Sequence, residues 1–424
     1  MSGTTSADAI IVGAGVIGLA IAEALSAEGR RVHVLDRQDP HLGGASVANA
    51  GWLNPYTLAP LPSRAALRMG LTSFAKPGSP LYIRPRPSIG LASWLVRFAA
   101  ATNARRFDRG RQALVALGHD GARRYLELAD DVVGLRKNSD ASLNIYATET
   151  GAAEAVLTDL APIDGAGPVP DYEVLTGGEA RAAEPLLTDR VGSALRIHGD
   201  LQLEPDTILT ALIAGIRARG GRVDLDTEVL GLTRSGDRIT GVRTSAGELT
   251  ADTVVVAAGA WSPELLRPHG VRLRMEPGKG YSVGLRVDAA PHDVLAFAAE
   301  KVGAVADAGQ IRLVGTMELS GVNETVDRRR VDAIVAAARP YLVPLAEAED
   351  PAALIGEIRV GMRPMFAGGL PVMDRVDGLD GLWLSTGHGM MGVTLALSAA
   401  AALRDYIETG QRPAVLEPFR LAGA

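Results

Sequence analysis

A glycine-rich segment near the N-terminus constrains the fold of this chain more than any other feature. The apolar run Ile10–Val12 leads into Gly13, Gly15 and Gly18, and Asp36 closes the next predicted strand, 18 positions after the last of these glycines. A buried strand, a glycine-rich turn, a helix start and an acidic residue in this order are typical of a dinucleotide-binding βαβ unit. The alternative is a turn that only joins a strand to a helix. We therefore expect an α/β fold with a pyrophosphate at the N-terminus of its first helix.

The acidic residue also restricts which dinucleotide can bind. The Asp36 carboxylate can accept hydrogen bonds from ribose hydroxyl groups, whereas its negative charge repels a 2′-phosphate. NADP is therefore disfavoured.

Composition excludes several classes of function. The 424 residues carry a net charge of −6, which gives no general electrostatic basis for binding nucleic acid. The chain has no cysteine, so disulfides, thiolate catalysis and iron–sulfur clusters are excluded, and we expect no metal site. It lacks the regions of a signal peptide and any run of about 18 apolar residues. These features predict a cytoplasmic location.

Patterning along the chain predicts two domains, each assembled from separate segments. A buried strand at Thr253–Val256 ends in the small residues Ala258 and Gly259 and resembles the first strand in texture. The stretch 271–364 contains three candidate antiparallel strands and a helix. We expect a dinucleotide-binding domain formed by residues 1–60, 191–270 and 365–424, and a second domain formed by residues 61–190 and 271–364 that covers the cofactor.

A cluster of basic residues marks the predicted helical region of the second domain. Arg105, Arg106, Arg109 and Arg111 lie within seven positions of one another. They form either a solvated helix face or a patch that docks on anionic lipid. The second interpretation would place the protein peripherally on the inner face of the membrane.

Five ordered blocks carry a resemblance to a known family. The blocks are Gly13–Gly18, Ala48–Gly51, Pro277–Ser282, Gly361–Met365 and Ser385–Gly389. In this order the chain resembles the D-amino-acid oxidase and glycine oxidase superfamily of FAD-dependent oxidoreductases, and within it the bacterial D-amino-acid dehydrogenases. The resemblance implies a discontinuous Rossmann-type FAD-binding domain and an α+β substrate-binding domain with an antiparallel sheet.

The resemblance also implies which residues hold FAD. The glycine loop would hold the pyrophosphate, Asp36 the adenosine ribose, and the backbone of Val229 the adenine edge. Some family members attach flavin covalently to a histidine in the loop that passes the flavin ring. Asn49 stands there in this chain, which predicts non-covalent FAD. The full set of expected cofactor contacts is Gly13, Gly15, Val16, Ile17, Gly18, Asp36, Arg37, Ser46, Ala48, Asn49, Ala50, Gly51, Val229, Ala258, Gly259, Gly387, His388, Gly389 and Met390.

Two features of this set concern the flavin ring itself. The turn Gly387–Gly389 opens the last predicted helix, whose N-terminus would stabilise negative charge on the reduced ring. His388 is either a contact of the ring or a turn residue bonded to the backbone.

Arg363 and Tyr281 are the candidate catalytic residues. Arg363 occupies the position of the family's substrate arginine, and a guanidinium offers two parallel donors that match a carboxylate. Its alternative role is a structural ion pair. Tyr281 is either a second donor to the same carboxylate or a core residue, and Lys279 is either a further contact or a surface charge.

The reaction implied by the resemblance is oxidative deamination of a D-amino acid to the 2-oxo acid and ammonia. Hydride passes from the α-carbon to flavin N5, and a quinone or another acceptor takes the electrons. The alternatives are a glycine- or sarcosine-type oxidase that uses oxygen, a D-proline or hydroxyproline dehydrogenase, a subunit of a larger dehydrogenase, and an NAD-linked reductase. The segments 52–56 and 301–310 are expected to shape the side-chain pocket. The sequence carries no signal for a particular oligomeric state.

Overall fold

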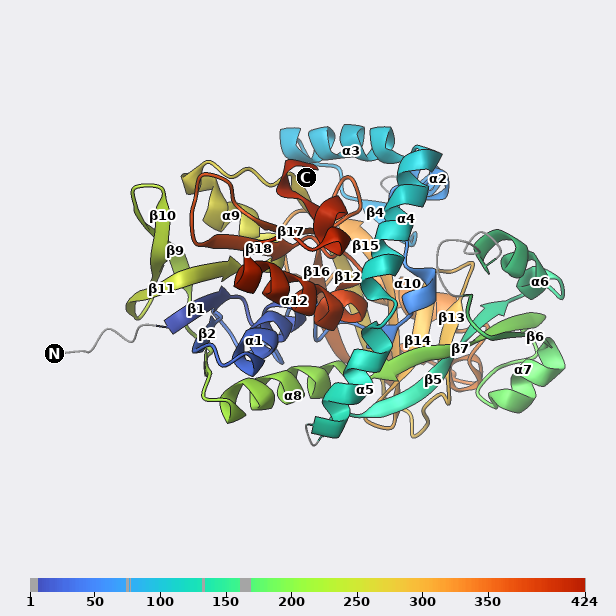
Figure 1. The fold of residues 1–424 in the computed structure, drawn as a ribbon. Coiled ribbons are helices and arrows are strands. Elements are labelled where there is room, and N and C mark those ends of the chain that lie inside the picture. The colour runs from blue at the N-terminus through green and yellow to red at the C-terminus, as the bar shows by residue number, and fades with distance from the viewer. Residues whose placement is uncertain (1–6, 74–75, 77, 132–133, 161–168, 424) are drawn as a thin grey trace.

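Two β-sheets form the framework of the protein (Figure 1). The computed structural model describes residues 7–73, 76, 78–131, 134–160 and 169–423. Within this part of the chain, no helix combines the length and the apolar character needed to cross a bilayer.

The first sheet has eight strands and carries the glycine-rich turn. Its main path runs β17-β18-β11-β1-β2-β8, and β10 joins β9 to β11. The strands β11, β1, β2 and β8 are parallel, as is the pair β11–β18, so their carboxyl ends meet at one edge. The bounds are β1 (Ala7–Val12), β2 (Val32–Leu35), β8 (Arg222–Asp224), β9 (Val229–Ser235), β10 (Arg238–Thr244), β11 (Gly247–Val256), β17 (Val372–Arg375) and β18 (Leu382–Thr386).

The continuous apolar run of β1 is explained by burial on both of its faces. Ile11 packs into a core to which three helices around this sheet contribute, among others, whereas Ile10 enters a separate core on the other side of the sheet. The three helices are α1 (Val16–Ala27), α8 (Pro205–Ala218) and α12 (Gly392–Thr409).

The second sheet has ten strands and forms the other half of the molecule. Its path runs β16-β12-β15-β14-β13-β5-β7-β3, with β4 beside β15 and β6 beside β7. Most of its pairs are antiparallel, as expected, but β13–β5 and β15–β4 are parallel. The bounds are β3 (Trp52–Leu53), β4 (Leu81–Ile83), β5 (Lys137–Tyr146), β6 (Tyr172–Thr176), β7 (Ser193–Leu203), β12 (Met275–Leu285), β13 (Val294–Phe297), β14 (Val302–Asp307), β15 (Gln310–Leu319) and β16 (Ile355–Phe366).

The remaining helices cover the two sheets. Helix α10 (Arg328–Ala338) packs on the ten-stranded sheet, and α4 (Ala104–Gly118) and α5 (Gly121–Asp131) cross and pack against α12 (Figure 1). The others are α2 (Arg64–Ser73), α3 (Ile89–Ala101), α6 (Gly151–Ala155), α7 (Gly177–Ala183), α9 (Ser262–Leu266) and α11 (Val343–Ala346). Short 3₁₀ or π turns span Pro55–Thr57, Val156–Leu160, Gly259–Trp261, Arg267–His269, Pro351–Leu354, Ala414–Phe419 and Leu421–Gly423.

The segment boundaries differ from the sequence-based expectation at three points. Strands β3 and β7 pair in the ten-stranded sheet, although their segments were expected in the dinucleotide-binding domain. Helices α4 and α5, expected in the second domain, share a core with α1 and α12. Strand β16 continues to Phe366, past the expected segment boundary at residue 364. The apolar pattern of a segment indicates that the segment is buried, but it does not indicate which strand or helix the segment packs against. This explains the differences.

Candidate active site

A cavity of about 890 Å³ lies between the two sheets. One wall is formed where β1, β2, β11 and β18 end, and the other by residues of β12, β13, β14, β15 and β16. Ligands of open α/β sheets bind at the carboxyl ends of parallel strands, and the cavity lies at that edge.

Close backbone contacts explain two glycines of the N-terminal turn. Gly13 has φ +112°, and a Cβ there would lie 2.7 Å from the carbonyl oxygen of Ala257. A Cβ on Gly18 would overlap the carbonyl oxygen of Gly13. Gly18 therefore lets α1 approach the turn, and it does not itself line the cavity.

The N-terminus of α1 points its free N–H groups toward the cavity. The helix begins at Val16 after Gly15, with no side-chain cap, and both residues line the cavity. The N–H group of Val16 donates to Oγ of Ser46 at 2.9 Å. An uncapped helix start beside a serine hydroxyl is suited to a phosphate group.

Asp36 and Arg37 define a second part of the cavity. The Asp36 carboxylate accepts hydrogen bonds from the N–H groups of Ala14 (2.7 Å) and Gln38 (3.2 Å), and burial raises its pKa. The Arg37 guanidinium lies 4.2 Å from the ring centre of Trp261, which also lines the cavity. Each Asp36 oxygen has capacity for another donor, such as a ribose hydroxyl.

The loop 46–51 passes along the cavity in a fixed conformation. Oδ1 of Asn49 accepts a hydrogen bond from the N–H group of Gly51 at 2.7 Å. Gly51 has φ +67°, and a Cβ there would overlap the carbonyl oxygen of Leu203. A Cβ on Gly361 of β16 would lie 2.8 Å from Cα of Ala45, so this strand packs directly against the start of the loop.

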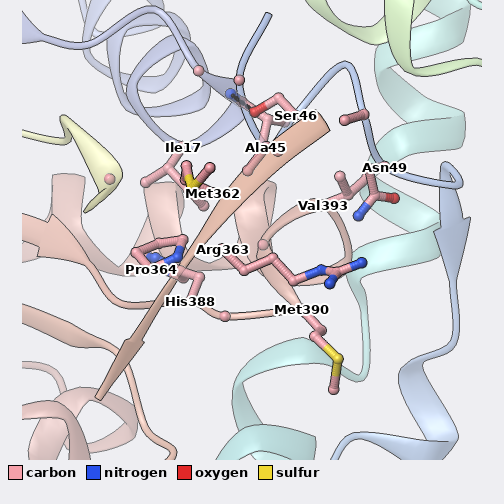
Figure 2. Close-up of a pocket in the computed structure, with 18 of the residues that line it drawn as sticks. Ile17, Ala45, Ser46, Asn49, Met362, Arg363, Pro364, His388, Met390 and Val393 are labelled. Carbon is pink, nitrogen blue, oxygen red and sulfur yellow. Dashed lines mark hydrogen bonds between the residues drawn. The ribbon is translucent and has the colours of Figure 1, made fainter. Parts of the chain in front are cut away.

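Arg363 presents its guanidinium to the cavity. Figure 2 shows the side chain extending between Asn49 and Met390. Its Nη1 donates to the carbonyl oxygen of Thr316 at 2.9 Å, and no described acidic residue forms an ion pair with it. Burial lowers the pKa of Arg363 to about 10. An enclosed cation without a counter-ion is the arrangement expected for binding an anionic ligand.

The structure places Tyr281 away from this guanidinium. Its hydroxyl donates to Oε2 of Glu318 at 2.8 Å, its side chain is buried in the core of the ten-stranded sheet, and it does not line the cavity. Successive residues of a strand face opposite sides, so Gly280 faces the guanidinium and Tyr281 faces away. The expectation that Tyr281 donates to the same ligand as Arg363 therefore conflicts with this geometry. Lys279 is likewise buried, 3.2 Å from Glu318.

The turn before α12 brings a buried imidazole to the cavity. Burial lowers the pKa of His388 to about 3, so its ring is neutral. Its Nε2 has no hydrogen-bond partner among the described residues. Gly389 donates its N–H group to the carbonyl oxygen of Pro364 at 2.9 Å, and α12 begins at Gly392 without a side-chain cap. Gly387 makes room for the ring of Phe366 and does not line the cavity.

Most of the expected site residues meet at this one cavity. Those that line it are Gly13, Gly15, Val16, Ile17, Asp36, Arg37, Ser46, Ala48, Asn49, Ala50, Val229, Ala258, Gly259, Arg363, His388, Gly389 and Met390. Those that do not are Gly18, Gly51, Gly387 and Tyr281.

Sequence reasoning missed two residues that shape the site, Thr316 and Asp200. Thr316, which holds Arg363, has φ +59°, and no sequence pattern identifies such a residue. Asp200 is buried and accepts hydrogen bonds from Nε1 of Trp52 (2.9 Å) and Oγ of Ser142 (2.7 Å), and burial raises its pKa to about 6. Trp52 lines the cavity, so Asp200 fixes part of its wall. Asp200 is the lone acidic residue of β7, between Gly199 and Leu201, and this position is a signal that could have been used.

The cavity fits FAD. The glycine turn and two uncapped helix starts suit an anionic pyrophosphate and an electron-rich ring. The Gly13 turn leaves no room for a side chain, and the His388 ring offers a free polar atom. The described residues include no group of three or more His, Asp or Glu side chains that could hold a metal ion.

Comparison with known proteins defines the class. Residues 8–406 match the family model of FAD dependent oxidoreductases (DAO). The chain belongs to this family, and it is an FAD-dependent oxidoreductase.

Its curated relatives and the solved structures that it resembles agree with this assignment. It is 32% identical over 420 residues to a D-amino acid dehydrogenase of Rhizorhabdus wittichii, covering 96% of this chain and 97% of the relative. It is 31% identical to a D-amino acid dehydrogenase of Methylobacterium nodulans, covering 96% of both. Glycine oxidase from Bacillus cereus has the same fold, with a TM-score of 0.72, 23% identity and 97% of each chain covered. So does L-proline dehydrogenase from P. horikoshii, with a TM-score of 0.73, 15% identity, and 98% and 97% covered.

Proposed function

We propose that this protein oxidatively deaminates a D-amino acid to the 2-oxo acid and ammonia, with Arg363 as the clamp for the substrate carboxylate. The observation that carries the proposal is the guanidinium without a counter-ion in the cavity of an FAD-dependent oxidoreductase. The names of the relatives support an amino acid, and specifically the D-isomer, as the substrate.

The chain's own residues bind and orient the substrate. The planar guanidinium of Arg363 can form two parallel hydrogen bonds with a carboxylate, which fixes the direction of the α-carbon. FAD, when bound, supplies the two-electron acceptor for the hydride of that carbon. The positive charge of Arg363 also lowers the pKa of a nearby substrate ammonium, which favours the neutral amine needed for oxidation. The resulting imino acid reacts with water and gives the 2-oxo acid and ammonia.

Two other features favour the oxidation. The N-terminus of α12 at Gly392 carries partial positive charge toward the cavity and stabilises electrons that arrive there. The His388 ring is neutral, so it can donate or accept a hydrogen bond with a ligand in the cavity without adding a charge.

The test is anaerobic bleaching of the bound flavin by matched D- and L-amino acids. We expect D-isomers to bleach it, and an Arg363→Met variant to keep FAD but lose bleaching. The matched control is Arg97→Met, which removes an exposed arginine of α3. Bleaching by L-isomers alone would refute the proposed stereochemistry.

The electron acceptor is the second part of the proposal. We propose a quinone or another carrier rather than oxygen, in keeping with the word dehydrogenase in the relatives' names. The competing function is a glycine- or sarcosine-type oxidase. Rapid oxygen consumption without an added acceptor would favour that function, whereas turnover that requires a soluble quinone analogue would favour ours.

We also propose that the surface formed by α2 and α3, called here the α2–α3 surface, contacts an anionic membrane. Residues 61–101, which include α2 and α3, carry six Lys or Arg and no Asp or Glu, whereas the rest of the chain carries 37 Lys or Arg and 49 Asp or Glu. Ile89, Val96 and Leu71 on this surface are 91%, 71% and 74% exposed. Figure 1 shows α2 and α3 together at one end of the molecule. Exposed apolar side chains flanked by cations are suited to an anionic bilayer.

This surface lies close to the active site. Trp94 of α3 donates a hydrogen bond from Nε1 to the carbonyl oxygen of Met365 at 3.0 Å, two residues after Arg363 in β16. A membrane contact here would therefore place the site near a lipid-soluble acceptor.

Cosedimentation with vesicles tests the membrane contact. We expect the holoenzyme to bind phosphatidylglycerol vesicles more strongly than phosphatidylcholine vesicles, with the difference lost at high salt. Ile89→Asp with Val96→Asp should abolish binding, whereas Leu157→Asp, at another exposed apolar residue, should not. A dimer that these two substitutions convert to a monomer would instead assign the surface to self-association.

A further inference from the structure

The guanidinium of Arg363 is held by an irregular segment of the neighbouring strand, Thr316–Glu318 of β15, called here the β15 bulge. Lys279 of β12 pairs with Glu318, but Tyr281, two residues on, pairs with Gly315, three residues back. The extra residue on β15 leaves Thr316 without a partner in the described ladders.

Thr316 adopts a backbone conformation that is unusual for its type. Its φ is +59°, which is a true outlier for a β-branched residue. Its carbonyl oxygen accepts the hydrogen bond from Nη1 of Arg363 instead of a ladder bond. Strained backbone of this kind persists where the surroundings fix it, and it concentrates at functional sites.

The other two residues of the bulge are fixed from the side away from the cavity. Nη2 of the buried Arg330 donates to the carbonyl oxygen of Met317 at 3.3 Å. The buried Glu318 carboxylate accepts the hydroxyl of Tyr281 at 2.8 Å and forms an ion pair with Lys279 at 3.2 Å. Each residue of the bulge is therefore tied to a different side chain.

Space on the cavity side is also limited. A Cβ on Gly280 of β12 would overlap the guanidinium of Arg363. The guanidinium of Arg363 therefore lies against Gly280, which has no side chain, and its Nη1 donates to the carbonyl oxygen of Thr316.

We infer that Glu318 is a positioning residue for the Arg363 clamp, and that Tyr281 and Lys279 act through it. The Glu318 carboxylate anchors the β15 bulge, the bulge directs the carbonyl of Thr316, and that carbonyl sets the orientation in which Arg363 meets a carboxylate. Tyr281 and Lys279 would then influence substrate binding without contacting the substrate. The inference rests on the proposed function of Arg363.

The experiment measures binding of pyruvate, which carries the carboxylate of the proposed product type, to the holoenzyme through the change in flavin absorbance. Glu318→Gln removes the charge that holds Lys279 and should raise the Kd for pyruvate about tenfold, the effect of losing about one charge-assisted hydrogen bond. KM should rise by a similar factor, with a smaller change in kcat. The matched control is Glu184→Gln, which alters an equally buried carboxylate that caps the N–H groups of Leu186 and His292.

Two further variants separate positioning from general stability. Tyr281→Phe removes only the hydroxyl that bonds to Glu318, and it should raise the Kd for pyruvate by a smaller factor than Glu318→Gln does. Thr316→Gly keeps the carbonyl and suits the positive φ, so Tm should hold or rise, which tests the backbone strain at this position separately from pyruvate binding. If Glu318→Gln does not fold, Tyr281→Phe decides the question.

The outcomes distinguish this inference from the proposed function. If the wild type and Glu184→Gln bind pyruvate and the Glu318 and Tyr281 variants bind it equally well, the positioning role is wrong and the clamp stands. If the wild type does not bind pyruvate or any other small carboxylate, the clamp itself is wrong.

Discussion

Replacing Arg363 by methionine should stabilise the protein while abolishing turnover. Burial lowers the pKa of this guanidinium from 12.5 to about 10. A shift of this size corresponds to roughly 3 kcal/mol of penalty for keeping the charge in the fold. The group is charged in both the folded and the unfolded chain at neutral pH, so the whole penalty is present there. Water in the cavity screens the charge, which makes this figure an upper bound.

The loss of one hydrogen bond opposes this gain. Methionine leaves the carbonyl of Thr316 without its donor, at a cost of about 1–3 kcal/mol. The net change in the free energy of unfolding is therefore at most about 2 kcal/mol in favour of the variant. Differential scanning calorimetry of the holoenzyme should show an unchanged Tm or a rise of a few degrees.

Arg330→Met provides the matched comparison. Arg330 is fully buried, whereas Arg363 is half-buried, and the guanidinium of Arg330 donates to the carbonyl oxygens of Ser79, Pro80 and Met317. Removing Arg330 takes a donor from each of these carbonyls, of which that of Pro80 still accepts the N–H of Met317 at 2.7 Å, so Tm should fall clearly. If Arg363→Met lowers Tm as much as Arg330→Met does, Arg363 is a structural residue and the reasoning about the clamp fails.

Three other predictions concern the cofactor site and its pH dependence. Gly18→Ala should weaken FAD binding at least tenfold in a fluorescence titration, since its Cβ overlaps the Gly13 carbonyl, whereas Gly90→Ala on α3 should bind FAD normally. The folded-state pKa of Asp200 is raised to about 6, so the wild type loses roughly 3 kcal/mol relative to Asp200→Asn as pH rises from about 4 through 6. Melts at pH 4.5 and 7.5 check this, and a pH-independent difference would contradict it. The neutral His388 ring should show no titration between pH 5 and 8 by NMR, and a titrating signal that disappears in His388→Gln would count against its burial.

The sequence predicted those parts of the fold and site that depend on local chemistry. The glycine turn, the uncapped start of α1 and the following acidic residue follow from short-range geometry, and each lies where it was expected. Arg363 was assigned to substrate binding from the family resemblance, and its side chain lines the cavity.

The rest depends on register and pairing, which a single sequence does not encode locally. A shift of one position along β12 exchanges the faces of Gly280 and Tyr281, so the tyrosine could not be assigned to the cavity or the core in advance. The strained φ of Thr316 arises from a bulge between two distant strands. The membership of β3 and β7 in the ten-stranded sheet is likewise a matter of long-range pairing.

The interleaving of the two sheets has a consequence for biosynthesis. Strand β18 pairs with β11, and the turn that follows it supplies His388 and the start of α12. One wall of the cavity therefore remains incomplete until residues 382–392 have been synthesised. Long-range pairing of this kind folds slowly. The flavin should consequently be captured after synthesis rather than during it, and a chain truncated before residue 382 should emerge colourless.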